Sequence, residues 1–119
     1  MKTEEIARKL VAYCRDGKWE QAQQELYASN AVSIEQEKSP MFEKETRGLA
    51  AIREKGKKWD AMVEKLHSNK VSEPIVTDNV FACTATMDVT MKGRGRTTMS
   101  ELCVYQVKDD KIVAEEFFM

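Results

Sequence analysis

Alternating hydrophobic and polar residues fill the last third of the chain and predict three consecutive β-strands there. The expected strands cover residues 81–91, 97–107 and 112–119. Residues 92–96, with two glycines, and 108–111, with two adjacent aspartates, separate them, and residues of these types favour turns. The pattern therefore predicts an antiparallel meander, whose apolar side must be covered by other elements.

Hydrophobic residues at helical spacing predict a helical hairpin at the start of the chain. The first helix is expected to begin after an N-cap at Thr3 and to end at Gly17, which suits a left-handed C-cap. The second helix is expected over about 18–28, with Trp19, Ala22, Leu26 and Gln23 facing inward.

A third helix is expected over 48–66, with an apolar face of Leu49, Ile52, Trp59, Val63 and Leu66. Gly56 lies within that face and costs about 1 kcal/mol relative to alanine in a helix. We therefore expect a close contact at Gly56 that needs the missing side chain.

Two shorter strands and one loop complete the prediction. Residues 31–36 alternate, with Val32 and Ile34 on one side, and 68–76 contains Pro74, which indicates an edge or a bulge. Residues 38–47 are polar around Met41 and Phe42, which predicts a loop that packs back over another part as a lid. Helices followed by a meander predict an α+β domain with one curved sheet and helices on one face.

Composition narrows the class of protein. The chain has 119 residues, which suits a single domain over 1–119, and 42% of them are hydrophobic. The net charge of −1 with mixed signs argues against nucleic-acid binding, and no apolar run is long enough for a membrane span. The acidic start, without the apolar region of a signal peptide, indicates a cytoplasmic protein.

The sequence contains no motif for a metal site or for dithiol redox chemistry. The chain has three cysteines without a CxxC pair and one histidine, which argues against a metal site or a dithiol redox motif. Cys83 and Cys103 fall within apolar strands, where small buried hydrophobes are the expected reading. We expect no metal and no cofactor.

Five segments resemble nuclear transport factor 2-like proteins, closest to the SnoaL-like polyketide cyclase and ketosteroid isomerase branch: DGKWE at 16–20, LYASNAV at 26–32, RGLAAI at 47–52, DNVFA at 78–82 and ELCVYQVKDDKI at 101–112. The resemblance spans the chain. It implies a cone-shaped, curved mixed sheet with three N-terminal helices on its concave face, the cystatin-like fold. It also implies an apolar cavity between sheet and helices, and a homodimer formed through the outer sheet face. The scaffold serves isomerases, cyclases, dehydratases and non-catalytic binding proteins, so it implies no one chemistry.

Strand parity assigns the cavity face. Phe81, Cys83, Ala85, Met87, Val89 and Met91 share the more apolar side of their strand, which should face the helices. On the next strand Met99, Glu101, Cys103, Tyr105 and Val107 share one side. We expect a small, flat or apolar ligand to contact Trp19, Phe42, Trp59, Phe81, Cys83, Met87, Met99, Cys103, Tyr105, Glu115 and Phe117. Either Glu115 or Glu116 must face inward, and the resemblance favours Glu115.

Three residues are candidates for catalysis. Glu101 lies mid-strand between apolar neighbours, which should raise its pKa, and the resemblance places it near an oxyanion-stabilising carboxylate. A salt bridge to Arg94, Arg96 or Lys111 is the alternative. By the same resemblance Glu35 lies at the proton-shuttling position, although it also suits an exposed strand end. His67, expected at the end of the third helix or the start of the next strand, suits either an acid/base role at the cavity mouth or a favourable interaction with the helix dipole.

Three functional hypotheses remain open. One is a dimeric enzyme of the isomerase or cyclase kind, using carboxylates on a ketone-bearing hydrophobic substrate. The second is a non-catalytic ligand-binding or protein-interaction module, which is favoured because the first-helix tyrosine of the isomerases falls at Leu10 here, with Tyr13 one turn on. The third, nuclear transport through protein partners, has no specific support. Apolar Val80, Ala82, Leu102 and Val104 on the outer sheet face favour a homodimer.

Overall fold

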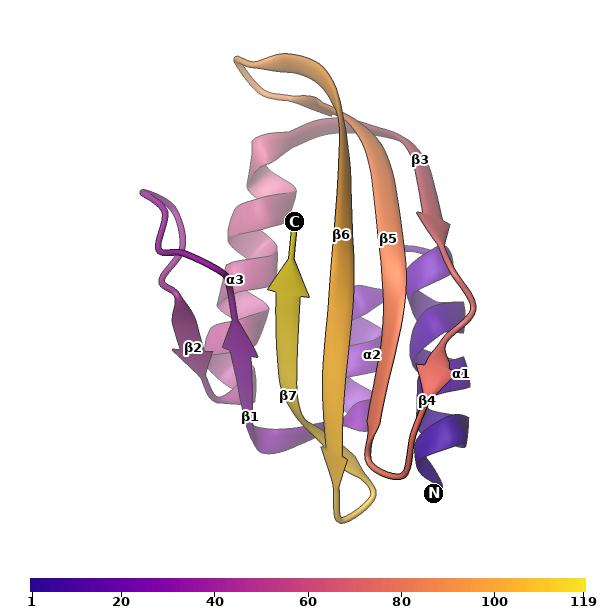
Figure 1. Cartoon of the computed structure of the whole chain (residues 1–119). Helices are drawn as coiled ribbons and strands as arrows, with labels where there is room; N and C mark the ends of the chain where they lie inside the picture. The colour runs from indigo at the N-terminus through magenta and orange to yellow at the C-terminus, as the bar shows by residue number, and fades with distance from the viewer.

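The computed structural model describes residues 1–119 as three helices packed against one curved sheet. Along the chain come the helices α1 (Thr3–Arg15) and α2 (Trp19–Leu26), the strands β1 (Tyr27–Ile34) and β2 (Glu45–Arg47), the helix α3 (Leu49–Met62), and then the strands β3 (Val63–Val71), β4 (Ile75–Val76), β5 (Val80–Met91), β6 (Gly95–Lys108) and β7 (Lys111–Phe118). The order in the sheet is β2-β1-β7-β6-β5-β3, with β4 paired to β5 (Figure 1). The predicted α+β class is confirmed.

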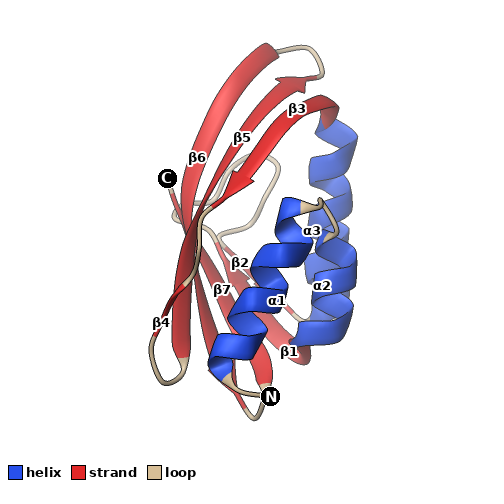
Figure 2. Ribbon diagram, turned by 90° about the vertical axis from the view of Figure 1, so that its right-hand side faces the viewer, coloured by secondary structure: helices blue, strands red, loops and turns tan.

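The sheet is mixed and curls around the helices. Strand β1 pairs in parallel with β7, whereas the other pairs are antiparallel. Figure 2 shows all three helices on the concave side of the sheet, with the opposite face uncovered. The core lies between these layers and joins α1 residues such as Ile6 and Leu10 to Phe81 on β5 and Ile112 on β7. Phe81 stacks on Tyr105 with ring centroids 4.8 Å apart.

The meander agrees with the sequence prediction. Strands β5 and β6 cover the first two expected segments, and β7 matches the third except that it ends at Phe118. Cys83 of β5 pairs with Cys103 of β6. Asp109 and Asp110 both have positive φ, 51° and 65°, as a two-residue hairpin turn with the twist of the strands requires. Buried Phe81, Cys83, Val89 and Met91 face the helices, as their parity predicted.

Helix α1 ends as predicted, but its N-cap is not the predicted residue. Gly17 has φ +70°, and the Lys18 amide donates to the Tyr13 carbonyl at 2.9 Å, which closes the helix end. Thr3 is the first helical residue rather than the N-cap, and its hydroxyl donates to the Asp78 carbonyl at 2.8 Å. The threonine therefore ties α1 to the loop before β5.

The second helix and the first strand have different bounds from those expected. Helix α2 ends at Leu26, and Tyr27 already belongs to β1, because it pairs with Ile112 of β7. The register of that pairing shifts between Tyr27 and Val32, which bends the strand. The predicted loop 38–47 is shorter, since its last three residues form β2.

The predicted third helix was too long. Helix α3 stops at Met62, and Val63 to Val71 form β3, which pairs with β5 over most of its length. Val63 and Leu66 therefore do not share a helical face, and Leu66 is 39% exposed. The expected close contact at Gly56 is also wrong, because an added Cβ there meets no atom within 4 Å. Pro74 lies in the break between β3 and β4, which agrees with the expected interruption.

Candidate functional site

A cavity of about 950 Å³ lies between the concave sheet face and the helices. Of its 37 lining residues 19 are hydrophobic. That volume suits a small organic ligand, and the mixed lining combines apolar contact area with polar groups that could orient it. None of the three helices has the length and apolar run needed to cross a bilayer.

Most of the expected ligand contacts line this cavity. They are Trp19, Phe42, Trp59, Cys83, Met87, Met99, Cys103, Tyr105, Glu115 and Phe117. Phe81 does not line it, because its ring is 1% exposed and packed in the core against Tyr105. Parity placed Phe81 on the correct sheet face, but the helix α1 covers that end of the face, so no cavity remains there.

Glu101 is a carboxyl in the cavity wall that forms no ion pair. It forms none of the considered ion pairs, since Arg96 instead bonds Asp88 at 2.8 Å and Lys111 donates to the Glu25 carbonyl. Burial, followed by the nearby charge of Glu35, raises the pKa of Glu101 to about 7. The Cys103 thiol donates to its Oε1 atom at 3.7 Å. A carboxyl in this state can donate or accept a proton near neutral pH.

Glu35 follows the last residue of β1 and also lines the cavity. Its Oε2 atom accepts from Lys55 Nζ at 2.8 Å, and the two side chains are only 28% and 15% exposed. Its amide donates to the Lys44 carbonyl, so the loop before β2 closes beside it. Glu35 is thus a half-buried, ion-paired acid and not the exposed strand end that was the alternative.

Glu115 lies at the centre of a buried polar cluster. It is 6% exposed, its carboxyl accepts from the Tyr27 hydroxyl, and its Oε2 atom accepts from Ser33 Oγ at 2.6 Å. Lys55 Nζ in turn donates to Ser33 Oγ at 2.9 Å. Burial raises the pKa of Glu115, while the two hydroxyl donors oppose that shift. Glu116 points the other way, as the resemblance implied.

Lys55 joins the acids of the cavity. It is the residue on α3 that contacts both Ser33 and Glu35, and its ammonium lies 5.4 Å from the centre of the Phe117 ring. Helical spacing could have suggested its direction, because it lies three residues after buried Ile52 and four before Trp59. The partners from β1 and β7 could not be inferred from that spacing.

Sequence reasoning also missed Tyr27 and Ser33. Ser33 shares its strand side with Glu35, so the alternation held the necessary signal, whereas Tyr27 appeared to belong to the second helix. Arg53 was missed too. It lines the cavity, and its Nε atom is buried without a hydrogen-bond partner.

His67 does not line the cavity, which corrects its expected place at the mouth. It lies within β3 rather than at a helix end, and its Nε2 atom is 2.6 Å from Thr90 Oγ1 on β5. The earlier end of α3 moves it onto a strand. Its bond to a neighbouring strand identifies it as a cross-strand contact.

The loop with Met41 and Phe42 lies at the cavity. Both residues line it, and the loop is closed by a bond from the Ser39 amide to the Phe42 carbonyl at 2.9 Å. Met41 is 44% exposed, so it lies at the margin, and Phe42 is partly buried. Their opening and closing as a lid stays a prediction.

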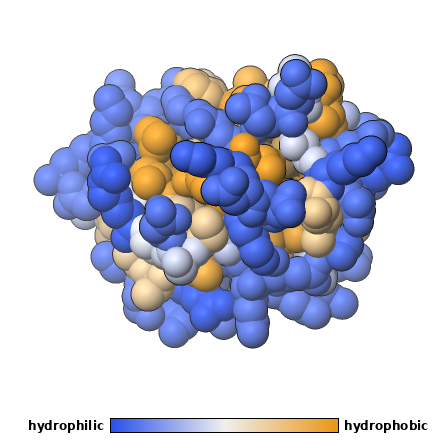
Figure 3. Space-filling model, turned by 90° about the horizontal axis from the view of Figure 1, so that it is seen from below, coloured by the Kyte–Doolittle hydropathy of each residue, from blue (hydrophilic) through white to orange (hydrophobic).

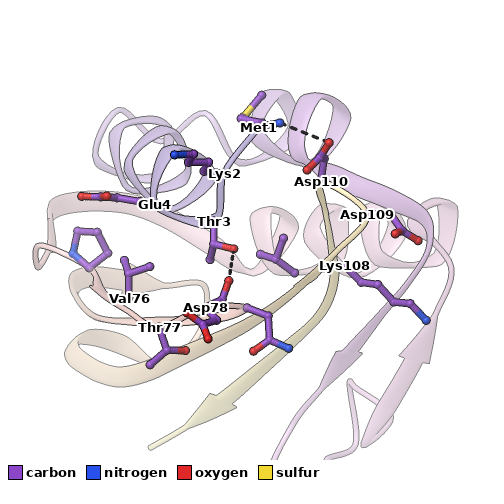
Figure 4. Close-up of a pocket in the computed structure, with 13 residues that line it drawn as sticks. Met1, Lys2, Thr3, Glu4, Val76, Thr77, Asp78, Lys108, Asp109 and Asp110 are labelled. Atoms are coloured by element: carbon purple, nitrogen blue, oxygen red, sulfur yellow. Dashed lines mark hydrogen bonds and ion pairs between the residues drawn. The ribbon is translucent and has the colours of Figure 1, made fainter.

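A second hollow, of about 840 Å³, lies near the N-terminus. Only three of its 13 lining residues are hydrophobic, and Figure 3 shows this end of the molecule as largely hydrophilic with hydrophobic residues in the gaps. Its polar groups bind one another: the Met1 amine lies 3.4 Å from Asp110, and Thr3 bonds Asp78 (Figure 4). The hollow gives no sign of a ligand.

Comparison with known proteins identifies the family and supports the fold. The model of the SnoaL-like domain matches residues 1–119. A crystal structure from Mesorhizobium loti, of a protein bearing the name SnoaL-like polyketide cyclase, is 32% identical, with full coverage of both chains and a TM-score of 0.92. The comparison with curated proteins gave no match.

More distant structures share the fold alone. An NTF2-like protein of unknown function from Burkholderia pseudomallei is 10% identical, with 100% of this chain and 92% of the other covered and a TM-score of 0.79. A protein with a ketosteroid isomerase-like fold from Catenulispora acidiphila, solved with trimethylamine, is 15% identical, with coverage of 97% and 85% and a TM-score of 0.71.

Proposed function

The chain belongs to the SnoaL-like domain family, and from that premise we propose that it binds a small, ketone-bearing apolar molecule and isomerises or cyclises it by carboxylate acid/base chemistry. The observation that supports this most is Glu101, a carboxyl without an ion pair in the wall of the cavity, about half of whose lining residues are hydrophobic. An acid whose pKa is about 7 can serve as donor or acceptor at neutral pH.

The two acids would have different roles. Glu35, as a carboxylate held by Lys55, would take a proton from the carbon beside the ketone and return it at a neighbouring carbon. Glu101, in its protonated form, would donate a hydrogen bond to the oxygen that becomes negative in the enolate. Glu35 and Glu101 line the same cavity, so one ligand could contact both carboxyls.

Glu115 would act indirectly. Both of its oxygens are already bonded, by Tyr27 and Ser33, and Ser33 also accepts from Lys55. This chain of bonds fixes Lys55, and Lys55 fixes Glu35. We therefore assign Glu115 to positioning of the base, beside its expected contact with the ligand.

A non-catalytic binding protein is the second candidate. The Tyr13 hydroxyl donates to Glu25 Oε1 at 2.5 Å and is not part of the cavity, so it cannot replace the missing first-helix tyrosine. The ion pair with Lys55 also occupies one oxygen of Glu35. Both observations favour ligand binding without turnover.

Proton exchange distinguishes the two candidates. A panel of saturated apolar ketones is incubated with the protein in heavy water, and NMR follows deuterium at the carbons beside the carbonyl. Enzyme-catalysed exchange should fall about 100-fold or more in Glu101→Gln and in Glu35→Gln, as for loss of a general acid or base. The exposed Glu64 on β3 supplies a matched control, Glu64→Gln. Full exchange in both cavity variants would refute the carboxylate mechanism. No exchange with the wild-type protein would favour the binding protein, and native mass spectrometry would then measure ligand binding alone.

The proposal includes a homodimer through the outer sheet face. Leu102 is 42% exposed on that face, with Val80, Ala82 and Val104 beside it in the paired strands β5 and β6. No helix covers the outer face of β5 and β6 (Figure 2), and an apolar sheet face of this kind favours an interface.

A further inference from the structure

All three cysteines of the chain line the cavity. Cys83 on β5 and Cys103 on β6 are directly opposite each other in the register, and each is 4% exposed. Cys14 reaches the same cavity from α1. The acid/base mechanism uses none of these thiols.

Only one of the three thiols has a carboxyl as its partner. Cys103 lies two residues after Glu101 on the same side of β6, and its Sγ atom donates to Glu101 Oε1 at 3.7 Å. Glu101 has no other side-chain partner. A thiol bonded to a general base is the arrangement that activates a cysteine nucleophile.

We propose that Cys103 is a nucleophile that adds to the double bond of an α,β-unsaturated carbonyl compound in the cavity, with Glu101 as its general base. This inference rests on the proposed function, because it names a ligand class for the same site. The step differs from the proposed isomerisation in the ligand atom that reacts. The thiol attacks the β-carbon, whereas the isomerisation removes a proton from the carbon beside the ketone.

The step balances without an oxidant or a cofactor. The Cys103 thiol proton moves to Glu101 as the sulfur forms a bond to the β-carbon. The π electrons of the double bond move toward the carbonyl oxygen, and the resulting enolate takes a proton at its α-carbon from Glu101. The reverse sequence returns the α-proton to Glu101 and eliminates the thiol, so the site can hold the ligand reversibly.

The surroundings explain why a base is needed. Cys103 is only 4% exposed, and burial in apolar surroundings keeps a thiol protonated, so at rest its proton lies on the bond to Glu101. Glu101 has a pKa of about 7 and becomes a base just above neutrality. The charged or titratable groups that face this pair come from five other elements or their ends, namely Cys14, Glu35, Lys55, Cys83 and Glu115.

Cyclohexenone, a small cyclic enone, is the probe for the test. Intact-mass spectrometry of the folded protein follows adduct formation, and peptide mapping locates the adduct. We expect one adduct for each chain, on Cys103, and a rate that rises with pH through about 7. Cys14→Ser and Cys83→Ser should still form it, whereas Cys103→Ser should not.

Glu101→Gln tests the base directly. It should slow the addition about 100-fold, the usual contribution of a general base, and remove the rise near pH 7. Circular dichroism verifies that each variant is folded. In urea, where all thiols are free of their partners, the rate should be equal in wild type and Glu101→Gln.

Three results would overturn the inference: no adduct on the folded protein, first modification of Cys14 or Cys83, or an unchanged rate in Glu101→Gln. The saturated ketones of the exchange assay have no double bond and cannot form this adduct. Exchange without adduct would therefore reject the nucleophile alone, and adduct without exchange would reject the ketone isomerase alone.

Discussion

The raised pKa of Glu101 predicts a loss of stability as the pH rises. Burial moves this pKa from its ordinary value of 4.5 to about 7. The folded protein then binds the proton more tightly than the unfolded chain does, so the free energy of unfolding falls between those two pH values. Below pH 4.5 the carboxyl is neutral in both states and has no such cost.

The magnitude follows from the same two values. Each pKa unit is equivalent to about 1.4 kcal/mol, so the full shift from 4.5 to about 7 corresponds to about 3 kcal/mol. Glu101 is half-buried, and its remaining contact with water reduces the effect. We expect Glu101→Gln to gain about 2 kcal/mol of stability over wild type between pH 4.5 and pH 8.

Guanidinium unfolding of both proteins at the two pH values measures this difference. Glu115 is also a buried acid with a raised pKa, but it is present in both proteins, so its effect cancels. The exposed acid Glu64 provides the control Glu64→Gln, which should show no gain. An equal pH dependence in wild type and Glu101→Gln would refute the view of Glu101 as a desolvated cavity acid.

Three further predictions concern other parts of the molecule. The Lys55–Glu35 pair should give a coupling of about 1–2 kcal/mol in a double-mutant cycle of Lys55→Met and Glu35→Gln, measured by urea unfolding, since the pair is mostly buried; additive effects would contradict it. Gly56→Ala should stabilise the protein by up to about 1 kcal/mol, because the helix gains propensity and the added Cβ meets no atom; a lower melting temperature would show that the space is not free. Native mass spectrometry should find a dimer in wild type and a folded monomer in Leu102→Glu; a monomeric wild type would count against the outer-face interface.

The sequence predicted the meander well because its signal is local. Parity placed Cys83 of β5 on the side that faces the helices. On β6 parity put Glu101 and Cys103 on one shared side, and the pairing of Cys83 with Cys103 shows that this side faces the cavity. The turn at Asp109 and Asp110 was equally readable, because a two-residue hairpin needs residues that tolerate positive φ.

The end of α3 could not be read in this way. Val63 and Leu66 continue the helical spacing of the preceding residues, yet their backbone groups pair with β5. Their hydrogen-bond partners lie 20 or more residues away in the chain. Local helix propensity carries no information about such partners, so it could not predict that the helix ends at Met62. The same long-range pairing puts His67 within β3, and it does not line the cavity.

The amino-acid sequence by itself determined which residues share a face, where the chain turns, and that one acid lies between apolar neighbours in the middle of a strand. Only the tertiary structure decided which acids are partnered. Lys55 from α3, Ser33 from β1 and Glu115 from β7 meet because three elements pack together, so Glu35 and Glu115 have partners while Glu101 has only a thiol. Desolvation and pairing depend on neighbours distant in the chain, and these two effects set the chemistry of each carboxyl.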